Sequence, residues 1–358
     1  MQKIDTKGIL PLCRILLLLF FAYGLQAQQD PMFTQYMFNS LTFNPAYAGS
    51  KDYMSANILY RTQWEGWNSR GNGLNPELTT GGAPVSQTFT LHSPVGKRVG
   101  MGLGIVNDKI GATESTGVNL AYAYRIPFAE GKLALAIQGG VINFRGNFKD
   151  LIAINPLPDD PAFADNELSR WRPTFGAGIY YHSERFYTGV SVPRLIETSL
   201  RDDVPGQNTR DIAQTYQHFY FTLGGAIPIK GNENFVFKPS CLVKSVGLLS
   251  ELQRSGSSVT TIGAPTQFDL DVSLFINRTF WVGTSFRSSF DIFISQESSY
   301  DSMDAWMAFF LKNGLRLGFA YDFSLTPIQN YSVGSFELSL GYDFSYTDKD
   351  QINSPRYF

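Results

Sequence analysis

The sequence predicts an all-β fold, a transmembrane antiparallel up-and-down β-barrel of about 14 strands. Three observations support this prediction. Short segments alternate between large apolar residues and small or polar ones, as strands do when one side faces lipid. The segments come in pairs, with a tight turn inside each pair and a long polar link between pairs. The mean hydropathy of -0.11 is too polar for a bundle of membrane helices, although 15% of the 358 residues are aromatic.

The alternation is clearest near the end of the chain. Within residues 315–324, Leu317 and Phe319 share one face, while Arg316 and Asp322 share the other. A soluble sandwich rarely places large aromatic residues along one side of nearly every strand, whereas a lipid-facing side favours them. We expect the polar faces to line the lumen, where charges either pair across water or form a selectivity ring or a peptide-docking surface. The predicted lumen residues are Asn119, Arg125, Gln138, Asp269, Asp271, Arg316, Asp322, Glu337 and Asp343.

The predicted strands make up a barrel domain over residues 53–346. Their number is even, as in single-chain bacterial barrels. The expected ranges are 53–63, 84–92, 98–107, 116–126, 133–144, 172–181, 186–193, 216–228, 235–246, 266–276, 279–288, 304–311, 315–324 and 332–346.

The links between strands alternate in length. Barrels of this class have short periplasmic turns and long extracellular loops, so we expect both ends of the chain on the periplasmic side. The short, turn-rich links are 93–97, 127–132, 182–185, 228–234, 277–278 and 312–314. The long, polar links are 65–82, 146–171, 194–216, 247–266 and 289–303.

Residues 1–27 are predicted to form a cleaved signal peptide. Basic residues, including Lys3 and Lys7, precede an apolar run over 15–22, and Gln28 would be the first mature residue. The alternative is a transmembrane anchor, which needs an apolar run of about 20 residues. The leader and the barrel together predict export to the Gram-negative outer membrane. Cleavage would leave a single cysteine and therefore no intramolecular disulfide.

Residues 28–52 are rich in aromatic residues but do not alternate as a strand does. Phe33, Tyr36, Leu41 and Phe43 could share one stripe of a short helix. One interpretation is that this segment packs into the barrel or against its periplasmic rim, where burial contributes about 1.5 to 3 kcal/mol per large side chain. The other interpretation is an exposed aromatic patch that binds a periplasmic partner.

Composition and motifs argue against nucleic-acid binding and catalysis. The formal net charge is -2, so the chain has no strong positive field to attract nucleic acid. The histidines, His92, His182 and His218, have no evident Ser or Asp partner in the predicted barrel. A nucleophile elbow, a metal-ligand cluster and a phosphate loop are all missing from the sequence. We therefore expect no enzymatic activity, no metal and no cofactor.

The sequence DPMFTQYMFN over 30–39, with NPAYAGS over 44–50, resembles the N-terminal signature of the PorP/SprF family of Bacteroidota. The ending SPRYF over 354–358 resembles the C-terminus of that family. Length and strand pattern are similar over essentially the whole mature chain, and the closest likeness is to SprF-like members. Met32 departs from the family pattern, because many relatives have a polar residue there.

This resemblance implies an outer-membrane component of the type IX secretion system. It implies a role in the export or surface anchoring of a large adhesin through the adhesin's C-terminal β-domain, in gliding or attachment. The implied partners are that adhesin, other type IX secretion components and outer-membrane lipid, and the family has no catalytic residues to carry over. The residues implied for partner binding are Asp30, Pro31, Phe33, Thr34, Gln35, Tyr36, Met37, Phe38, Asn39, Asn44, Pro45, Ala46, Tyr47, Gly49, Pro355, Arg356, Tyr357 and Phe358.

Two further regions are candidates for contact with partners. The predicted periplasmic tail over 347–358 ends in aromatic residues, which either direct barrel assembly or bind another secretion component. The long acidic link over 146–171 either docks a basic or aromatic partner or is an ordinary solvated loop. Its candidate cargo-binding residues are Asp159, Asp160, Phe163 and Trp171.

A passive porin for small solutes is the alternative function. An open lumen would favour a porin, whereas a lumen filled by residues 28–50 would disfavour it. The two terminal motifs favour secretion, because a general porin needs neither an aromatic leader segment nor an appended polar tail.

Overall fold

The computed structural model of the chain describes residues 30–66, 82–147, 167–196, 217–246, 266–290 and 300–344. The predicted signal peptide and the C-terminal tail lie outside these ranges, and their roles stay predictions. The same holds for the candidate residues Asp159, Asp160, Phe163, Pro355, Arg356, Tyr357 and Phe358.

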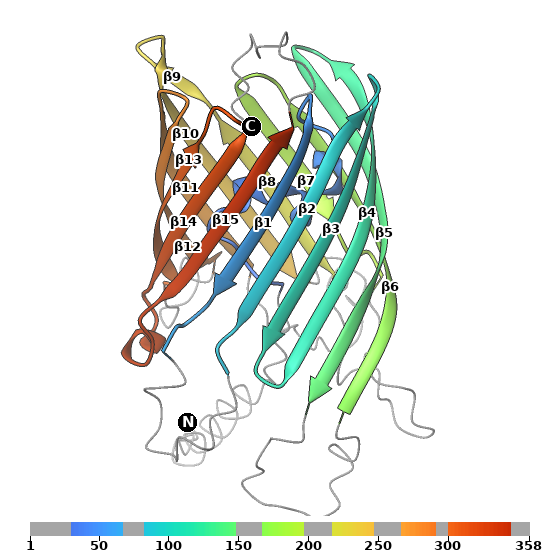
Figure 1. Cartoon of the computed structure of the whole chain (residues 1–358), viewed down its shortest axis with the longest axis vertical. Coiled ribbons are helices and arrows are strands. Elements are labelled where there is room, and N and C mark those ends of the chain that lie inside the picture. Colours follow the sequence, from blue (N-terminus) through green and yellow to red (C-terminus); the bar gives the residue numbers. More distant parts are fainter. Residues whose placement is uncertain are drawn as a thin grey trace, which may run out of the picture.

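The described strands form one closed antiparallel barrel (Figure 1). Their order follows the chain, and β15 pairs with β1. Because β8 and β9 both pair with β10 and follow one another along it, the barrel has 14 strands, and the predicted fold is confirmed. The strands are β1 (Met54–Thr62), β2 (Val85–Val95), β3 (Val99–Ile110), β4 (Thr113–Phe128), β5 (Gly131–Asn147), β6 (Glu167–His182), β7 (Phe186–Val192), β8 (His218–Gly225), β9 (Ile227–Ile229), β10 (Asn232–Val246), β11 (Gln267–Ile276), β12 (Phe280–Ser289), β13 (Ser302–Phe310), β14 (Leu315–Ser324) and β15 (Ser335–Phe344).

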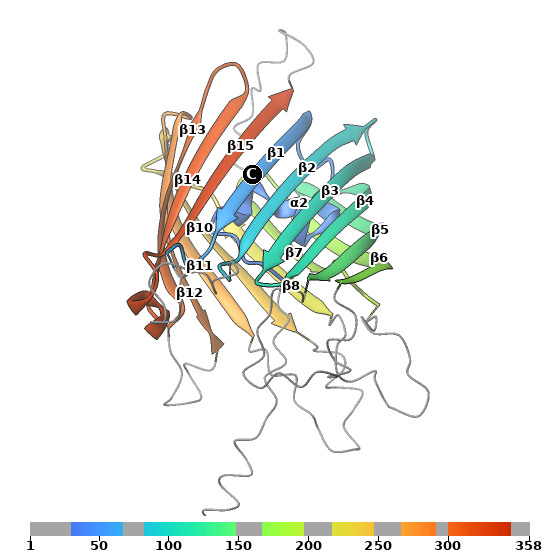
Figure 2. The same cartoon turned by 60° about the horizontal axis from the view of Figure 1, so that its bottom comes forward.

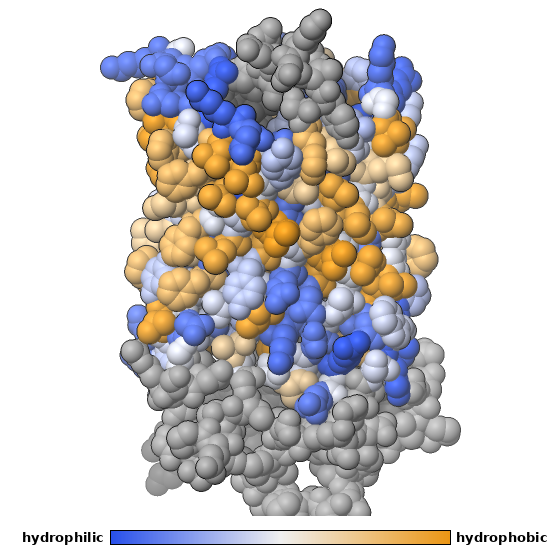
Figure 3. Space-filling view, in the orientation of Figure 1, coloured by the Kyte–Doolittle hydropathy of each residue, from blue (hydrophilic) through white to orange (hydrophobic). Residues whose placement is uncertain are grey.

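Side chains alternate between the outer surface and the lumen. In β14, Leu317 and Phe319 are 44% and 40% exposed, whereas Arg316 and Asp322 are 4% and 2% exposed. The outward side chains form an apolar belt with hydrophilic bands near both ends (Figure 3), as expected for a surface solvated by lipid. The predicted lumen residues all face inward, which confirms the period-two analysis. Within the described ranges, no helix has the length and apolarity needed to cross a bilayer.

The two ends of the barrel differ in their connections (Figure 1). Hairpin turns close one end, which we call the short-turn end. At one of them, Asn277 and Arg278 have φ angles of 51° and 54°, as two-residue hairpins require. The opposite end, the long-link end, carries the connections that are long in sequence, with one short exception at residues 111–112. In outer-membrane barrels the short turns face the periplasm.

Several strands, β5 and β6 among them, reach further toward the long-link end than the sequence predicts. We expected strands over 133–144 and 172–181, whereas β5 and β6 extend to Asn147 and back to Glu167. Trp171 therefore lies in β6, paired with Asn143 and 61% exposed, and not in a loop as predicted. The reason is that backbone pairing continues past the apolar belt. Hydropathy marks the edge of the lipid, not the end of the strand.

The first described residues lie inside the ring of strands, where α2 is visible in Figure 2. Three short helices follow one another there, η1 (Tyr36–Phe38), α2 (Ser40–Phe43) and η2 (Pro45–Tyr47). Asn44 caps η2 by accepting the Ala46 N–H at 2.9 Å, with proline at the first helical position. A further short helix, η7 (Pro327–Asn330), lies in the link between β14 and β15.

Candidate functional site

Residues 30–50, which we call the lumen segment, cross the barrel interior from one end to the other. The Asp30 N–H donates to Nε2 of His218, which begins β8 after a long link, at 3.1 Å. The Gly49 N–H donates to Nδ1 of His92, near the short turn after β2, at 3.3 Å. The segment thus runs from the long-link end to the short-turn end. The prediction that the chain begins on the short-turn side is wrong for the first described residue.

Asp30 is held at the long-link end by side chains from several strands. Its carboxylate forms an ion pair with Arg194 and accepts the Tyr220 hydroxyl at 3.1 Å. The Lys244 ammonium donates to its main-chain oxygen at 3.0 Å. We expected no acidic partner for His218, but its Nδ1 lies 3.8 Å from the Asp30 carboxylate. Asp30 and His218 are 188 positions apart in the sequence, so a local sequence pattern could not predict this contact.

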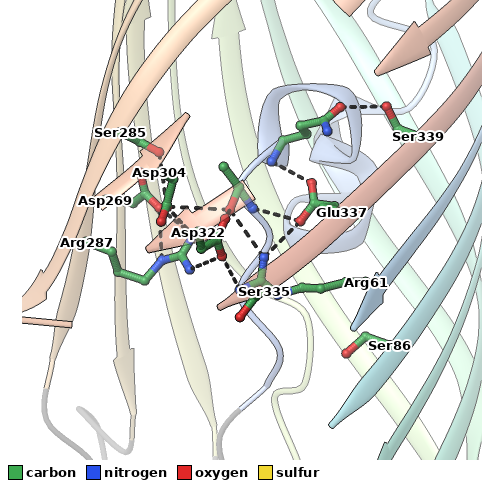
Figure 4. A network of polar contacts seen from close by, with 12 residues as sticks. Arg61, Ser86, Asp269, Ser285, Arg287, Asp304, Asp322, Ser335, Glu337 and Ser339 are labelled. Atoms are coloured by element: carbon green, nitrogen blue, oxygen red, sulfur yellow. Dashed lines mark hydrogen bonds and ion pairs between the residues drawn. The ribbon is translucent and has the colours of Figure 1, made fainter. Parts of the chain in front are cut away.

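Glu337 of β15 binds the backbone of the lumen segment directly (Figure 4). Its two carboxylate oxygens accept the Thr34 and Gln35 N–H groups at 3.0 and 2.7 Å. Arg61 of β1 lies 3.2 Å from the same carboxylate and donates to the Thr34 hydroxyl at 3.2 Å. The Ser339 hydroxyl donates to the Gln35 side chain at 2.6 Å. Glu337 is fully buried, so these bonds replace its lost hydration.

The network continues across the lumen to β11, β12, β13 and β14 (Figure 4). The Thr34 hydroxyl donates to Asp322 at 2.6 Å, and Asp322 lies 2.5 Å from Arg61. Arg287 lies 2.8 Å from Asp269 and 3.5 Å from Asp304. Two guanidinium groups and four carboxyl groups, all buried, therefore form one network. The hydroxyl of Thr34, in the lumen segment, lies within this network. A buried network of this kind strongly penalises the loss of any single partner.

Aromatic side chains pack the middle of the segment against the wall. Phe33 and Phe43 lie 6.0 Å apart between ring centroids, and Phe43 lies 5.2 Å from Tyr220. On the other side, Phe38 meets Trp281 edge to face at 5.1 Å. Rings in such contact add to the free energy gained by burial.

Buried phenols in the segment act as hydrogen-bonding groups. The Tyr36 hydroxyl lies 2.6 Å from the Ser240 hydroxyl. Tyr36 and Tyr47 are 2% and 7% exposed, and burial disfavours the charged form of a phenol. Both side chains are therefore neutral at physiological pH.

Wall glycines make room for the segment. A Cβ atom on Gly100 would lie 2.0 Å from the carbonyl oxygen of Ala48, and one on Gly178 would lie 2.2 Å from Oδ1 of Asn44. Asn44 uses that proximity, because its Nδ2 donates to the carbonyl oxygen of Ile179 at 3.0 Å. Glycine at these positions allows backbone to approach backbone. The fit extends along the wall, since the Ser191 hydroxyl donates to the Phe43 carbonyl.

Among the described residues, a cavity lies on each side of the lumen segment. One, of about 630 Å³, lies on the long-link side and is lined by Asp30, Phe33 and Arg194, among others. The other, of about 240 Å³, lies on the short-turn side and is lined by Phe38, Tyr47 and others. Across the described ranges, no group of three or more His, Cys, Asp or Glu side chains is placed to hold a metal ion. The arrangement is that of a plugged barrel, built to fix a segment in place.

The structure brings the predicted N-terminal candidates together inside the lumen, not on an exposed patch. Phe33, Tyr36 and Phe43 are at most 2% exposed, so the exposed-patch interpretation is wrong for the described residues. Sequence analysis missed Arg61 and Arg287, although both are charged residues within predicted strands. Their position on the lumen face of a strand was the available signal. The remaining candidates in the segment are Asp30, Pro31, Thr34, Gln35, Met37, Phe38, Asn39, Asn44, Pro45, Ala46, Tyr47 and Gly49.

A closed antiparallel barrel with an apolar outer belt and a polar, filled lumen is an outer-membrane protein. The chain belongs to the PorP/SprF family of type IX secretion system membrane proteins, whose family model matches residues 25–342. The family and the barrel are those of a secretion-system protein of the outer membrane. The described N-terminal residues that carry the family signature are the residues that fill the lumen.

Solved structures share the barrel architecture at low identity. The outer membrane protein Omp33 of Acinetobacter baumannii is 8% identical with a TM-score of 0.41, covering 82% of this chain and 99% of that one. A Pseudomonas aeruginosa FadL homologue is 14% identical with a TM-score of 0.44, covering 91% of this chain and 97% of that one. These distant likenesses carry no argument about function. None of the curated proteins compared with the chain matches it.

Substitution of Gly100 by alanine is expected to displace the end of the lumen segment, because the new methyl group would meet the Ala48 backbone. Overpacking of this kind costs about 1 to 3 kcal/mol. In planar bilayers, we expect Gly100→Ala to conduct ions more readily than the wild-type protein. Gly104→Ala is the matched control, because no atom lies within 4 Å of its Cβ position on the same face of β3. Equal conductance of the two variants would contradict the fit described for the segment.

Substitution of Thr34 by valine removes the hydroxyl between Arg61 and Asp322 without changing the side-chain shape. An unsatisfied buried polar partner costs about 1 to 3 kcal/mol, so amide hydrogen exchange over residues 33–43 should accelerate by roughly 10- to 100-fold. Thr42→Val is the control, because the Thr42 hydroxyl bonds only within the segment, to Asn39 at 2.9 Å. Equal exchange in both variants would show that the ionic network does not hold the segment.

Proposed function

We propose that this barrel assists the export or the surface anchoring of a large adhesin, through the adhesin's C-terminal β-domain, in gliding or attachment. The observation that supports this proposal is a lumen filled by the family-signature segment. A filled lumen leaves the outer wall and the two rims as the surfaces that can meet another protein. The chain belongs to a family of type IX secretion proteins, which supports a role for such a contact in that secretion system.

A passive porin is less well supported. A solute would have to pass the buried contacts of Thr34 and Gln35 with Glu337, and then the packed rings of Phe38 and Trp281. The two cavities lie on opposite sides of this barrier. Diffusion would therefore require the segment to leave the lumen. That movement would break a buried charge network.

Cargo would meet the long-link end of the barrel. The larger cavity opens among residues of that end, including Arg194, Lys244 and Trp64. Trp171 adds an exposed aromatic side chain to the outer face nearby, on the extended part of β6. We propose that the acidic link, with Asp159, Asp160 and Phe163, contributes contacts to the same partner.

The signature residues would support binding by fixing the shape of the barrel and not by touching the cargo. Burial of Phe33, Thr34 and Tyr36 leaves no surface for direct contact. Ordered lumen contacts reach the neighbouring strands β13, β14, β15 and β1 and also β6 and β7, so the segment connects separate parts of the barrel wall. The tail residues Pro355, Arg356, Tyr357 and Phe358 stay candidates for binding another secretion component.

Affinity purification of the tagged protein from native outer membranes tests the proposal. In mild detergent, we expect one large secreted protein with a C-terminal β-domain to co-purify and to be identified by mass spectrometry. A variant lacking residues 33–50 should still insert as a barrel but recover much less of this partner. Heat-modifiable migration on gels checks insertion of both proteins.

Two results would count against this function. Recovery of the barrel alone, together with steady ion conductance of the wild-type protein in bilayers, would support the porin. Failure of the 33–50 deletion to form a barrel would assign the segment a role in assembly. In that case, Thr34→Val and Gly100→Ala, which keep the chain intact, should be used to compare partner recovery.

A further inference from the structure

Strand β6 is paired along its whole length on one side but along less than half of it on the other. On the β5 side, pairing runs from Glu167 to His182. On the β7 side, pairing begins only at Ala177, whose partner Val192 is the last residue of β7. Among the described residues, no strand pairs with residues 167–174 on that side. We call this part of β6 the free edge.

The backbone groups of alternate residues point toward the free edge. Just beyond the end of β7, the carbonyl oxygen of Phe175 accepts the Leu195 N–H at 2.7 Å. Because the bonding direction alternates along a strand, the backbone groups of Pro173, Trp171 and Ser169 point the same way. Proline lacks an N–H and is confined to the edge side of a strand, which agrees with this assignment. In the part of the chain that the structure describes, the N–H groups of Ser169 and Trp171 have no acceptor.

Side chains limit which chains can pair with the free edge. The Arg170 guanidinium donates to the carbonyl oxygen of Ser169, and that of Arg172 donates to the carbonyl oxygen of Trp171, each at 3.2 Å. Basic residues and proline on an edge strand oppose indiscriminate pairing. A carbonyl oxygen has two lone pairs, so each can still accept a bond from an incoming strand. The edge is therefore selective, not closed.

The free edge lies at the border of the apolar belt and beyond it. On the outer face of β3 to β6, paired side chains form rows, and the composition changes from one row to the next toward the long-link end. The apolar row is Ile105, Val118, Val141 and Pro173, and the next row is Asn107, Thr116, Asn143 and Trp171. Aromatic residues such as Trp171 are typical of the membrane interface. Unpaired backbone is not tolerated in hydrocarbon, but it is tolerated in water outside the belt.

The larger cavity lies beside the free edge. Thr174 of β6 and Pro193, which follows β7, both line this cavity. Ile142 and Phe144 of the adjoining β5 line it as well. A strand added to β6 would continue the line of β7, so every second side chain of that strand would face the cavity. Those side chains would meet apolar neighbours.

We propose that the free edge of β6 binds a β-strand of the partner, with apolar side chains of that strand directed into the larger cavity. This inference rests on the function proposed above, and the β-domain of the adhesin would supply the strand. The edge selects this kind of partner, because an extended chain presents carbonyl groups at the spacing of the Ser169 and Trp171 N–H groups. A helix uses its carbonyl groups internally and cannot do so.

Matched proline and alanine substitutions test the edge. Trp171→Pro removes the side chain and the N–H, whereas Trp171→Ala removes the side chain alone. The lost N–H faces away from β5, so the barrel should form, as it does with Pro173. In affinity purification from native outer membranes, Trp171→Pro should recover roughly 10-fold less β-domain partner than Trp171→Ala, as for one lost hydrogen bond. Ser169→Pro and Ser169→Ala are a second matched pair with the same expectation.

Hydrogen exchange of the wild-type protein tests the same edge if a proline variant fails to insert, as judged by heat-modifiable migration. Amides over 167–174 should exchange about 10-fold more slowly in the complex than in the barrel alone. Amides over 101–107 of β3, which is paired on both sides, should not change.

The outcomes separate this inference from the function on which it rests. Equal recovery by inserted proline and alanine variants would overturn the inference, as would unchanged exchange over 167–174 in the complex. Either result would leave the export function standing, because the wild-type protein would still recover the partner. If the wild-type protein recovers no β-domain partner, the export function fails and the inference fails with it.

Discussion

The burial of charge inside a closed barrel is the constraint on which the rest of the structure depends. Arg61 and Arg287 lie among four carboxyl groups where water is largely excluded, and an unpaired charge there is costly. Glu337 satisfies its two oxygens with backbone N–H groups of Thr34 and Gln35. The lumen segment and the polar lumen face of these strands therefore stabilise each other, while strand pairing closes the barrel itself.

Different interactions hold different parts of the lumen segment in place. Near the long-link end, polar contacts fix the position of residues 30–35. Further on, rings and glycines take over: Phe38 packs on Trp281, and the backbone of Ala48 lies against Gly100. Close packing thus predominates over residues 38–48, and Arg125 also donates to the Gly49 carbonyl oxygen near the short-turn end. A barrel plugged in this way offers its rims and outer wall to a partner, which is consistent with a role in secretion and not in diffusion.

Individual residues show which structural features a local sequence pattern can predict and which it cannot. Period-two alternation was sufficient to place Asp322 and Glu337 on the lumen face, because side-chain direction in a strand depends only on position along it. The same alternation could not show that β6 continues through Trp171, because hydropathy follows the lipid boundary. Nor could it pair Asp30 with His218, since those residues meet only when the barrel closes. The outward-patch interpretation of the aromatic segment was wrong for the same reason.

By itself, the sequence determined the barrel, its even strand number, the lipid-facing and lumen-facing sides and, through the signature over 30–50, the family. These properties depend on short-range periodicity and on local motifs, which a chain carries before it folds. Only the tertiary structure decided the direction of the lumen segment, the partners of Arg61 and the division of the interior into two cavities. Each of these depends on contacts between strands distant in sequence, and closure of the barrel is the physical event that creates them.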